Sequence, residues 1–136
     1  MSRLHQVLYI ALPALFCAAC LPASRGGSSL PSGGSALAVE QGDASYYGDQ
    51  FVGRSTANGE RYSHTEMTAA HRTFPFGTIA RVINTRNGRE TVVRINDRGP
   101  HKPSRVIDLS RRAAEELDMI RDGIVPVRVE VLRWGG

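Results

Sequence analysis

The amino-acid sequence predicts one small domain of mainly β structure, closed into a barrel and accompanied by one or two short helices. Its 136 residues leave room for one modest domain and exclude a large multidomain enzyme. Four segments carry the apolar pattern of strands with one buried face, at residues 44–47, 78–84, 91–96 and 125–132. A closed barrel suits six or seven such short strands, because closure removes the exposed edges of a small sheet.

Turn and capping residues define the elements between these strands. Asn87 and Gly88 lie between the second and third segments, and an Asn-Gly pair is the strongest short-range signal for a tight hairpin. Ser110 can cap a short helix over residues 111–117, which has a small apolar face. Gly123 then falls in the turn before the last strand.

The N-terminal region has the organisation of a targeting segment followed by a linker. Residues 7–19 form an apolar run that is too short to span a bilayer and is typical of a signal peptide. Small residues precede Cys20, and this stretch resembles a bacterial lipoprotein cleavage site with Cys20 as the lipid-bearing N-terminus; plain secretion is the alternative. Eleven of residues 21–36 are Gly, Ser or Pro, a composition that behaves as a flexible tether. We therefore expect a lipoprotein signal peptide over 1–19, a lipid-anchored linker over 20–39 and the barrel domain over 40–134.

Composition excludes several classes of chemistry. Both cysteines, Cys17 and Cys20, lie in the first twenty residues, so the rest of the chain can form no disulfide, thiolate metal site or cysteine nucleophile. No nucleotide-binding or zinc-protease motif occurs, and no histidine pair has the usual spacing of metal ligands. The net charge of +4 is mild and basic residues are sparse among the aromatics, so nucleic acid is not an expected partner. We expect neither a metal nor a cofactor.

Three titratable residues near turn signals are candidates for chemistry. Asp97 ends an apolar strand and enters a Gly-Pro turn, where a carboxyl can be partly buried and pass its proton to a leaving oxygen; a turn-forming Asp is the alternative. Glu60 follows an Asn-Gly pair, and its alternative is a solvated loop carboxylate. His71 lies at a strand end, where a hydrogen-bonded structural histidine is an equal possibility.

Aromatic and basic residues supply candidates for sugar binding. Tyr46 and Tyr47 are adjacent on a strand and must point to opposite faces, so one belongs to the core and the other can line a groove. Which of them does so is open. Arg98 can grip acidic groups of a substrate, with surface solvation or an ion pair to Asp108 or Glu115 as the alternative.

A series of ordered motifs carries a family resemblance. They are A-S-Y-Y-G at 44–48, T-A-N-G-E at 56–60, M-T-A-A-H-R-T-F-P-F-G-T at 67–78, V-x-N-x-x-N-G-R at 82–89, V-V-R-I-N-D-R-G-P at 92–100 and R-V-I-D-L-S at 105–110. In order and separation they resemble the rare lipoprotein A family over nearly all of residues 43–132. The resemblance implies a six-stranded double-psi β-barrel, the fold shared with expansins, in a bacterial cell-envelope lipoprotein that acts on peptidoglycan.

The resemblance also implies an activity and a set of site residues. Active members are lytic transglycosylases, which cleave the bond between N-acetylmuramic acid and N-acetylglucosamine without water and leave a 1,6-anhydro end, preferentially on peptide-stripped strands. The catalytic positions fall on Asp97, Glu60 and His71. Asp97 would be the acid and base, and Glu60 and His71 would hold its protonation state, orient the sugar or stabilise positive charge at the anomeric carbon. The substrate-binding positions that we expect are Tyr46, Tyr47, Asn58 and Arg98. The expected partners are peptidoglycan glycan strands and the outer membrane, reached through the lipid anchor on a monomer that faces the periplasm.

Two other functions use the same residues. A non-catalytic module could bind peptidoglycan or loosen the wall as expansins do, without releasing soluble fragments. A polysaccharide hydrolase would need a second carboxylate that activates water on the opposite face of the sugar. Asp108 is the one further candidate for that role, and a place in the turn between barrel and helix is its alternative.

Overall fold

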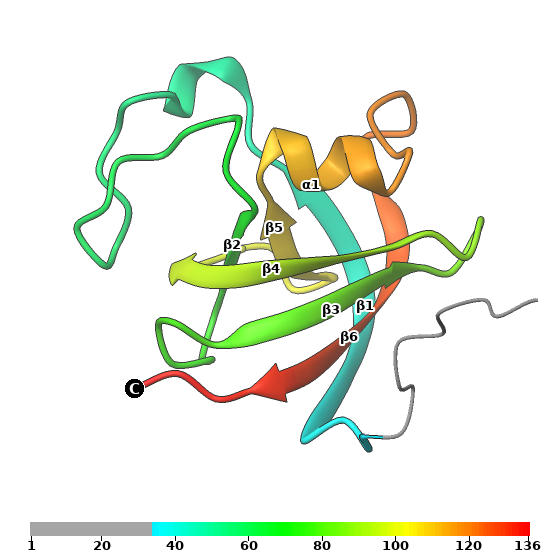
Figure 1. Ribbon diagram of the computed structural model, residues 1–136. Coiled ribbons are helices and arrows are strands. Elements are labelled where there is room, and N and C mark those ends of the chain that lie inside the picture. Colours follow the sequence, from blue (N-terminus) through cyan, green and yellow to red (C-terminus); the bar gives the residue numbers. More distant parts are fainter. Residues whose placement is uncertain (1–33) are drawn as a thin grey trace, which may run out of the picture. The chain divides into compact units, whose positions relative to one another are not determined.

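The computed structural model describes residues 34–136, which form a closed six-stranded barrel with one α-helix (Figure 1). The expected signal peptide, Cys20 and the linker up to residue 33 lie outside the described residues. Residues 38 and 39, which the sequence analysis assigned to the linker, are the first two of a strand. The elements in chain order are β1 (Ala38–Tyr46), the 3₁₀-helix η1 (Asp49–Phe51), β2 (Thr68–His71), β3 (Ile79–Asn84), β4 (Glu90–Asp97), β5 (Arg105–Leu109), α1 (Arg111–Glu116) and β6 (Val125–Arg133).

The strands close in the order β1-β5-β2-β4-β3-β6. Two of the pairs, β1 with β5 and β2 with β4, are parallel, and the other four are antiparallel. Alternate residues fill the interior, as β6 illustrates with Val127, Val129 and Val131, each at most 2% exposed. The mainly β fold class and the six-stranded double-psi β-barrel predicted from the sequence are confirmed.

The predicted helix and hairpin are both present. The side chain of Ser110 accepts a hydrogen bond from the backbone N–H of Ala113, and α1 buries Ala113 and Ala114 against one end of the barrel. Strands β3 and β4 form the antiparallel hairpin, but its loop holds five residues, 85–89, rather than two. Gly88 takes φ +75° in this loop, a conformation that glycine adopts without steric cost.

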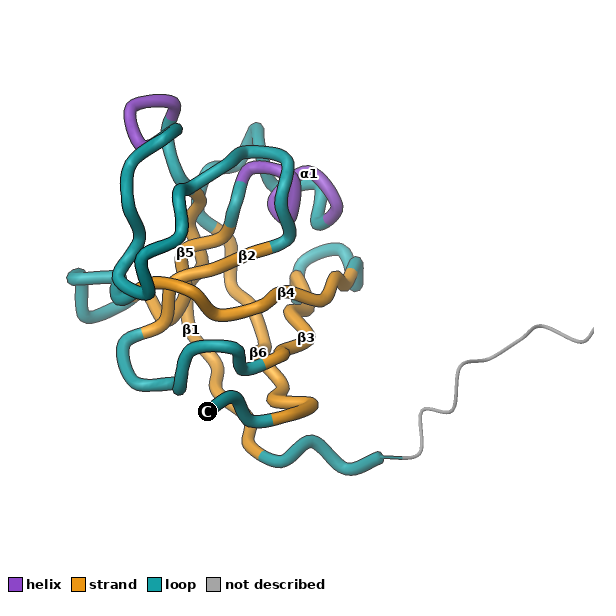
Figure 2. The backbone as a smooth tube through the Cα atoms, turned by 60° about the vertical axis from the view of Figure 1, so that its left-hand side comes forward, coloured by secondary structure: helices purple, strands orange, loops and turns teal. Residues whose placement is uncertain are grey.

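The hydrophobic pattern of the sequence did not identify two of the strands, β2 and β5. All four residues of β2 are buried, so no alternation of polar and apolar residues marks it. These strands lie side by side between β1 and β4 in the barrel (Figure 2). A long loop, residues 47–67, rises over this end of the barrel. Within the described residues, no helix is long and apolar enough to cross a membrane.

Candidate active site

A groove of about 330 Å³ opens where β1, β4 and β5 end beneath the long loop. We call this cavity the groove and define it by its lining. Strands β4 and β5 contribute Asp97 and Asp108, the long loop after β1 contributes four residues, and the connection from β4 to β5 contributes three. Its lining residues are Tyr47, Phe51, Arg54, Ser55, Asp97, Arg98, Gly99, His101 and Asp108.

Asp97 is held at the groove by three hydrogen-bond donors. The pairing of β2 with β4 shifts by one residue after Ala69, so that Asn96 is skipped and Asp97 pairs with Ala70. A bulge of this kind changes the direction in which a side chain points. Oδ1 of Asp97 accepts the backbone N–H groups of Ala57 at 2.8 Å and Arg98 at 2.9 Å. Oδ2 accepts the hydroxyl of Tyr47 at 2.6 Å. The carboxyl group is therefore fixed in orientation, with Oδ2 facing the groove beside a phenol.

The two adjacent tyrosines do point to different places. The Tyr47 hydroxyl donates to Asp97, and burial, followed by that hydrogen bond and the charges of Asp97 and Asp108, raises the pKa of Tyr47 far above its usual value. Tyr47 thus keeps its proton and remains a donor. Tyr46 packs against the core, and its hydroxyl donates to the carbonyl of Ile120 at 2.9 Å, so the structure does not bring Tyr46 to the groove.

Glu60 is paired beside the groove instead of lining it. Its carboxylate accepts two hydrogen bonds from Arg94, at 2.7 and 2.9 Å, and a third from the side chain of Asn96 at 3.1 Å. The hydrogen bonds from Arg94 and Asn96 lower the pKa of Glu60 from 4.5 to about 2. This ion pair fastens the loop over residues 56–60 to β4, and the same loop carries the Ala57 N–H that binds Asp97.

Asn58 stabilises the same loop from within. Its side-chain oxygen accepts the Thr56 hydroxyl at 2.7 Å and the Glu60 backbone N–H at 3.0 Å. Its own backbone N–H donates to the carbonyl of Asn96 at 3.2 Å. Asn58 is not among the lining residues of the groove.

His71 is buried, with only 3% of its side chain exposed, and it does not line the groove. Nδ1 accepts the backbone N–H groups of Thr73 and Phe74, so a neutral ring carries its proton on Nε2, which lies 2.6 Å from Glu40 Oε2. The imidazole ring stacks on the Phe74 ring, with 3.5 Å between the ring centres. Burial lowers the pKa of His71, and its link to the groove runs through its carbonyl, which accepts from Arg98 at 3.3 Å.

Arg98 lines the groove, and two contacts fix the position of its guanidinium group. Its guanidinium donates to the carbonyl of Phe74 at 2.9 Å and lies 3.9 Å from the centre of the Phe76 ring. These contacts hold a positive charge at the edge of the groove. Of the seven site residues expected from the sequence, the groove therefore brings together Tyr47, Asp97 and Arg98.

Asp108 is a groove residue that sequence reasoning placed elsewhere. It lies inside β5 rather than in the turn to the helix, and it alternates with the buried Ile107 and Leu109. Its outward position in a strand was the available signal, but β5 itself was not recognised. The loop residues Phe51 and Arg54 were missed because no strand or motif places them over the barrel end.

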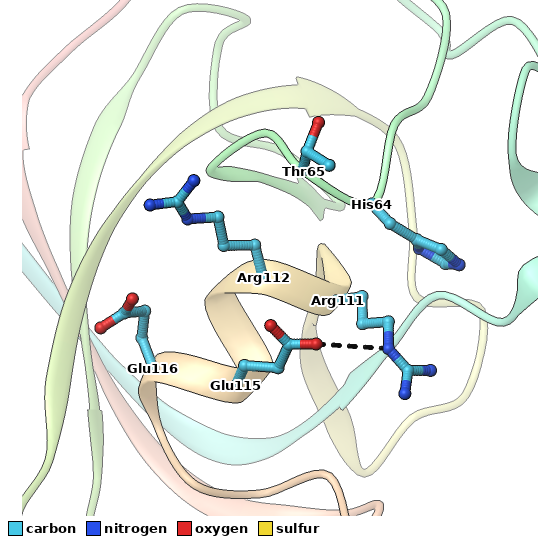
Figure 3. A pocket seen from close by; sticks show the side chains of 6 residues that line it. All are labelled: His64, Thr65, Arg111, Arg112, Glu115 and Glu116. Carbon is cyan, nitrogen blue, oxygen red and sulfur yellow. Dashed lines mark ion pairs between the residues drawn. The ribbon is translucent and has the colours of Figure 1, made fainter.

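A second pocket, of about 440 Å³, lies between α1 and the long loop (Figure 3). Two Arg and two Glu side chains line it, and Arg111 pairs with Glu115 at 3.4 Å; Nε2 of His64 lies 2.9 Å from Asp49 Oδ1. None of the expected site residues lines it. Across residues 34–136, no three His, Cys, Asp or Glu side chains are grouped as metal ligands would be.

Comparison with known proteins agrees with this fold. The family model described as "Lytic transglycolase" matches residues 39–129. The "Streptomyces papain inhibitor" is 24% identical with a TM-score of 0.59, over 72% of this chain and 97% of that one. An expansin variant of Clavibacter michiganensis in complex with cellohexaose is 19% identical with a TM-score of 0.56, over 71% of this chain and 51% of that one.

Curated relatives match at higher identity. The "Probable endolytic peptidoglycan transglycosylase RlpA" of Nostoc sp. is 64% identical over 94 residues, 68% of this chain and 25% of that protein. The protein of the same name from Synechocystis sp. is 42% identical over 132 residues, 97% of this chain and 41% of that protein. The chain thus spans between a quarter and about two fifths of the length of these relatives. Because the family model covers about two thirds of the sequence, the chain belongs to the rare lipoprotein A family of lytic transglycolase domains.

Proposed function

We propose that this protein is an endolytic peptidoglycan lytic transglycosylase. It cleaves the glycosidic bond between N-acetylmuramic acid and N-acetylglucosamine and leaves a 1,6-anhydro end on the muramic acid. The observation that carries the proposal is the carboxyl group of Asp97, which three donors hold at the groove with Oδ2 beside the Tyr47 hydroxyl. The names of the relatives from Nostoc and Synechocystis support the same activity.

Asp97 acts as the acid that starts the reaction. Its proton passes from Oδ2 to the glycosidic oxygen, the bond from that oxygen to the anomeric carbon breaks, and N-acetylglucosamine leaves with a free hydroxyl. The Tyr47 hydroxyl and the two backbone N–H groups stabilise the carboxylate that remains. The 6-hydroxyl of the muramic acid then attacks the anomeric carbon and gives up its proton to a base, for which the Asp97 carboxylate is available. No water is consumed.

The other site residues bind the glycan or position Asp97. Phe51 is 36% exposed, packs edge-to-face with Tyr47 at 5.4 Å and offers an aromatic face for a sugar ring. Arg98 supplies a positive charge at the groove edge for acidic groups of the muramic acid. Glu60 and His71 act as positioning residues, Glu60 through the loop of Ala57 and His71 through Arg98.

The same proposal places the protein in the cell envelope. Lipidation of Cys20 would anchor it in the outer membrane, facing the periplasm, with a preference for peptide-stripped glycan strands. The Gly-, Ser- and Pro-rich composition of residues 21–36 supports a tether, which would have a reach of about 20–25 Å. Replacing Cys20 with Ser should move the protein from the membrane fraction to the soluble periplasmic fraction, and continued membrane fractionation would contradict the anchor.

The full chain, incubated with intact sacculi and with amidase-stripped glycan, tests the activity by mass spectrometry of the soluble products. Asp97→Asn keeps the size of the side chain and removes the proton, so anhydro-muramyl fragments should fall at least about 100-fold. Asp122→Asn is the matched control, because Asp122 is exposed and lies outside the groove. Fragments released by Asp97→Asn at the parent's rate would overturn the mechanism.

A non-catalytic peptidoglycan-binding lipoprotein remains the second candidate function. The partly exposed ring of Phe51, which lines the groove, would serve a binder as well as an enzyme. Sacculus pulldown by the parent, with no soluble fragments on either substrate, would favour this function over the lyase.

A further inference from the structure

A second carboxylate shares the groove with Asp97. Both Asp97 and Asp108 line it, from β4 and β5 respectively. The strand between these two is β2, and Ala70 is the register partner of Asp97 on one side and of Asp108 on the other. Residues in register across strands project to the same face, and neighbouring strands are about 4.8 Å apart, so the two Cα atoms lie roughly 10 Å apart with only an alanine between them.

One carboxylate oxygen of Asp108 accepts a hydrogen bond, and the other accepts none from the described residues. Oδ1 accepts the hydroxyl of Ser45, and the guanidinium Nε of Arg105 lies 3.8 Å from the same oxygen. Arg105 also donates to the Ser45 hydroxyl at 2.9 Å, which completes a cluster on β1 and β5. Within residues 34–136, Oδ2 of Asp108 accepts no hydrogen bond.

The backbone around Oδ2 leaves space for a substrate. Gly99 has φ +134°, and a Cβ built there would lie 3.9 Å from Asp108 Oδ2 and 3.9 Å from His101 Nε2. A side chain at this position would contact Asp108 Oδ2, and glycine leaves that space unfilled. Tyr47 lies close enough to both carboxylates for each to raise its pKa, after burial.

We infer that Asp108 is a second catalytic carboxylate, the base that accepts the proton of the substrate's attacking 6-hydroxyl. The inference rests on the proposed lytic transglycosylase function and divides its two proton transfers, the acid step to Asp97 and the base step to Asp108. Asp97 has three of its four acceptor positions occupied, whereas Asp108 Oδ2 accepts no hydrogen bond from residues 34–136 and lies on the other side of Ala70. Asp97 gives its proton to the leaving oxygen as the bond from that oxygen to the anomeric carbon breaks. The 6-oxygen bonds to the anomeric carbon, and the proton of the 6-hydroxyl moves to Asp108. Exchange with solvent then restores both groups.

The test compares Asp108→Asn with the parent in the full chain, on amidase-stripped glycan. Loss of the base should lower the rate of anhydro-end formation about 100-fold or more, with the thermal midpoint and the glycan affinity unchanged. The remaining rate should also no longer fall toward acid pH, a change that a purely structural role would not produce. Ser45→Ala is the structural control, because it removes the support of Oδ1 and keeps the carboxylate.

The possible results separate the two levels of the proposal. Anhydro ends formed by Asp108→Asn at the parent's rate, or with the parent's acid limb intact, would overturn the inference and leave the proposed function standing. No anhydro ends from the parent would overturn the proposed function itself. If Asp108→Asn does not fold, Asp108→Glu replaces it in the test. The longer side chain displaces the carboxylate, so the inference predicts slower anhydro-end formation with the acid limb of the pH–rate profile retained. A rate equal to the parent's would contradict the inference.

Discussion

The groove and the polar clusters beside it contain the same kinds of residue, but they differ in what their polar atoms face. In the groove, Asp108 Oδ2 and one acceptor position of Asp97 remain open to a substrate. In the clusters, Glu60 is matched by Arg94 and Asn96, and His71 has a partner for each ring nitrogen. A catalytic group needs an atom that is free to contact the substrate, whereas a polar group with all its hydrogen bonds made stabilises the fold. From this difference we propose that the aspartates take part in the reaction steps and that Glu60 and His71 position them.

Removing the hydroxyl from Tyr47 should have the largest effect of the changes that sharpen this comparison. Tyr47→Phe keeps the packing against Tyr62 and takes away the donor to Asp97 Oδ2. The carboxylate formed in the first step then loses one of three stabilising bonds, and we expect kcat to fall about 10- to 100-fold with the glycan affinity nearly unchanged. Steady-state kinetics on stripped glycan measure this. A variant as fast as the parent would separate Tyr47 from the reaction.

Glu60→Gln should have a smaller effect, spread over stability and activity. The substitution breaks the two-bonded ion pair with Arg94, a half-exposed contact worth about 1 kcal/mol or less of unfolding free energy. A loosened loop positions the Ala57 N–H less well against Asp97, so we expect kcat to drop about 10-fold. Urea unfolding and product assays check the two effects. Complete loss of cleavage in a folded Glu60→Gln protein would instead make Glu60 a reacting group.

The pH dependence of stability distinguishes the clusters further. The folded-state pKa of Glu60 is lowered from 4.5 to about 2, so its ion pair adds stability above pH 4.5 that is lost as the pH falls toward 2. Gln at this position should abolish that part of the acid dependence. Equal acid sensitivity of the parent and Glu60→Gln would show that the ion pair does not form in solution.

His71→Gln should change stability more than catalysis. The folded-state pKa of His71 is lowered by burial, so the neutral ring is favoured and stability declines as the pH falls below the unfolded value of about 6.5. Losing the buried hydrogen bonds should cost about 1–3 kcal/mol of unfolding free energy at neutral pH, and the decline below pH 6.5 should shrink. Kinetics on the folded variant should stay within a few-fold of the parent. A folded variant without activity would restore His71 to a reacting role.

The sequence predicts this fold well where the pattern is local. Alternation located β3, β4 and β6, and Ser110 located α1, because each signal lies within a few residues. Strand β2 is buried throughout, and β5 joins the barrel through long-range pairs, so neither has a comparable local signature.

The candidate site divides in the same way. Asp97 and Tyr47 stand at strand ends, and local reasoning named both as candidates, although it left open whether Tyr46 or Tyr47 lines the groove. The charged partners of Glu60 and His71, Arg94 and Glu40, lie 34 and 31 residues away in the chain, a separation that no spacing rule connects. The place of Asp108 beside Asp97 depends on β2 lying between their strands, which is a property of the closed barrel alone.

The most direct test of the central claim is cleavage of stripped glycan by the full chain in water labelled with heavy oxygen. If the groove aspartates direct attack by the substrate's own 6-hydroxyl, the new muramic ends are anhydro sugars, one water lighter than reducing ends, and carry no label. Labelled reducing ends would show that water is the nucleophile, and would make the protein a hydrolase in contradiction to this account.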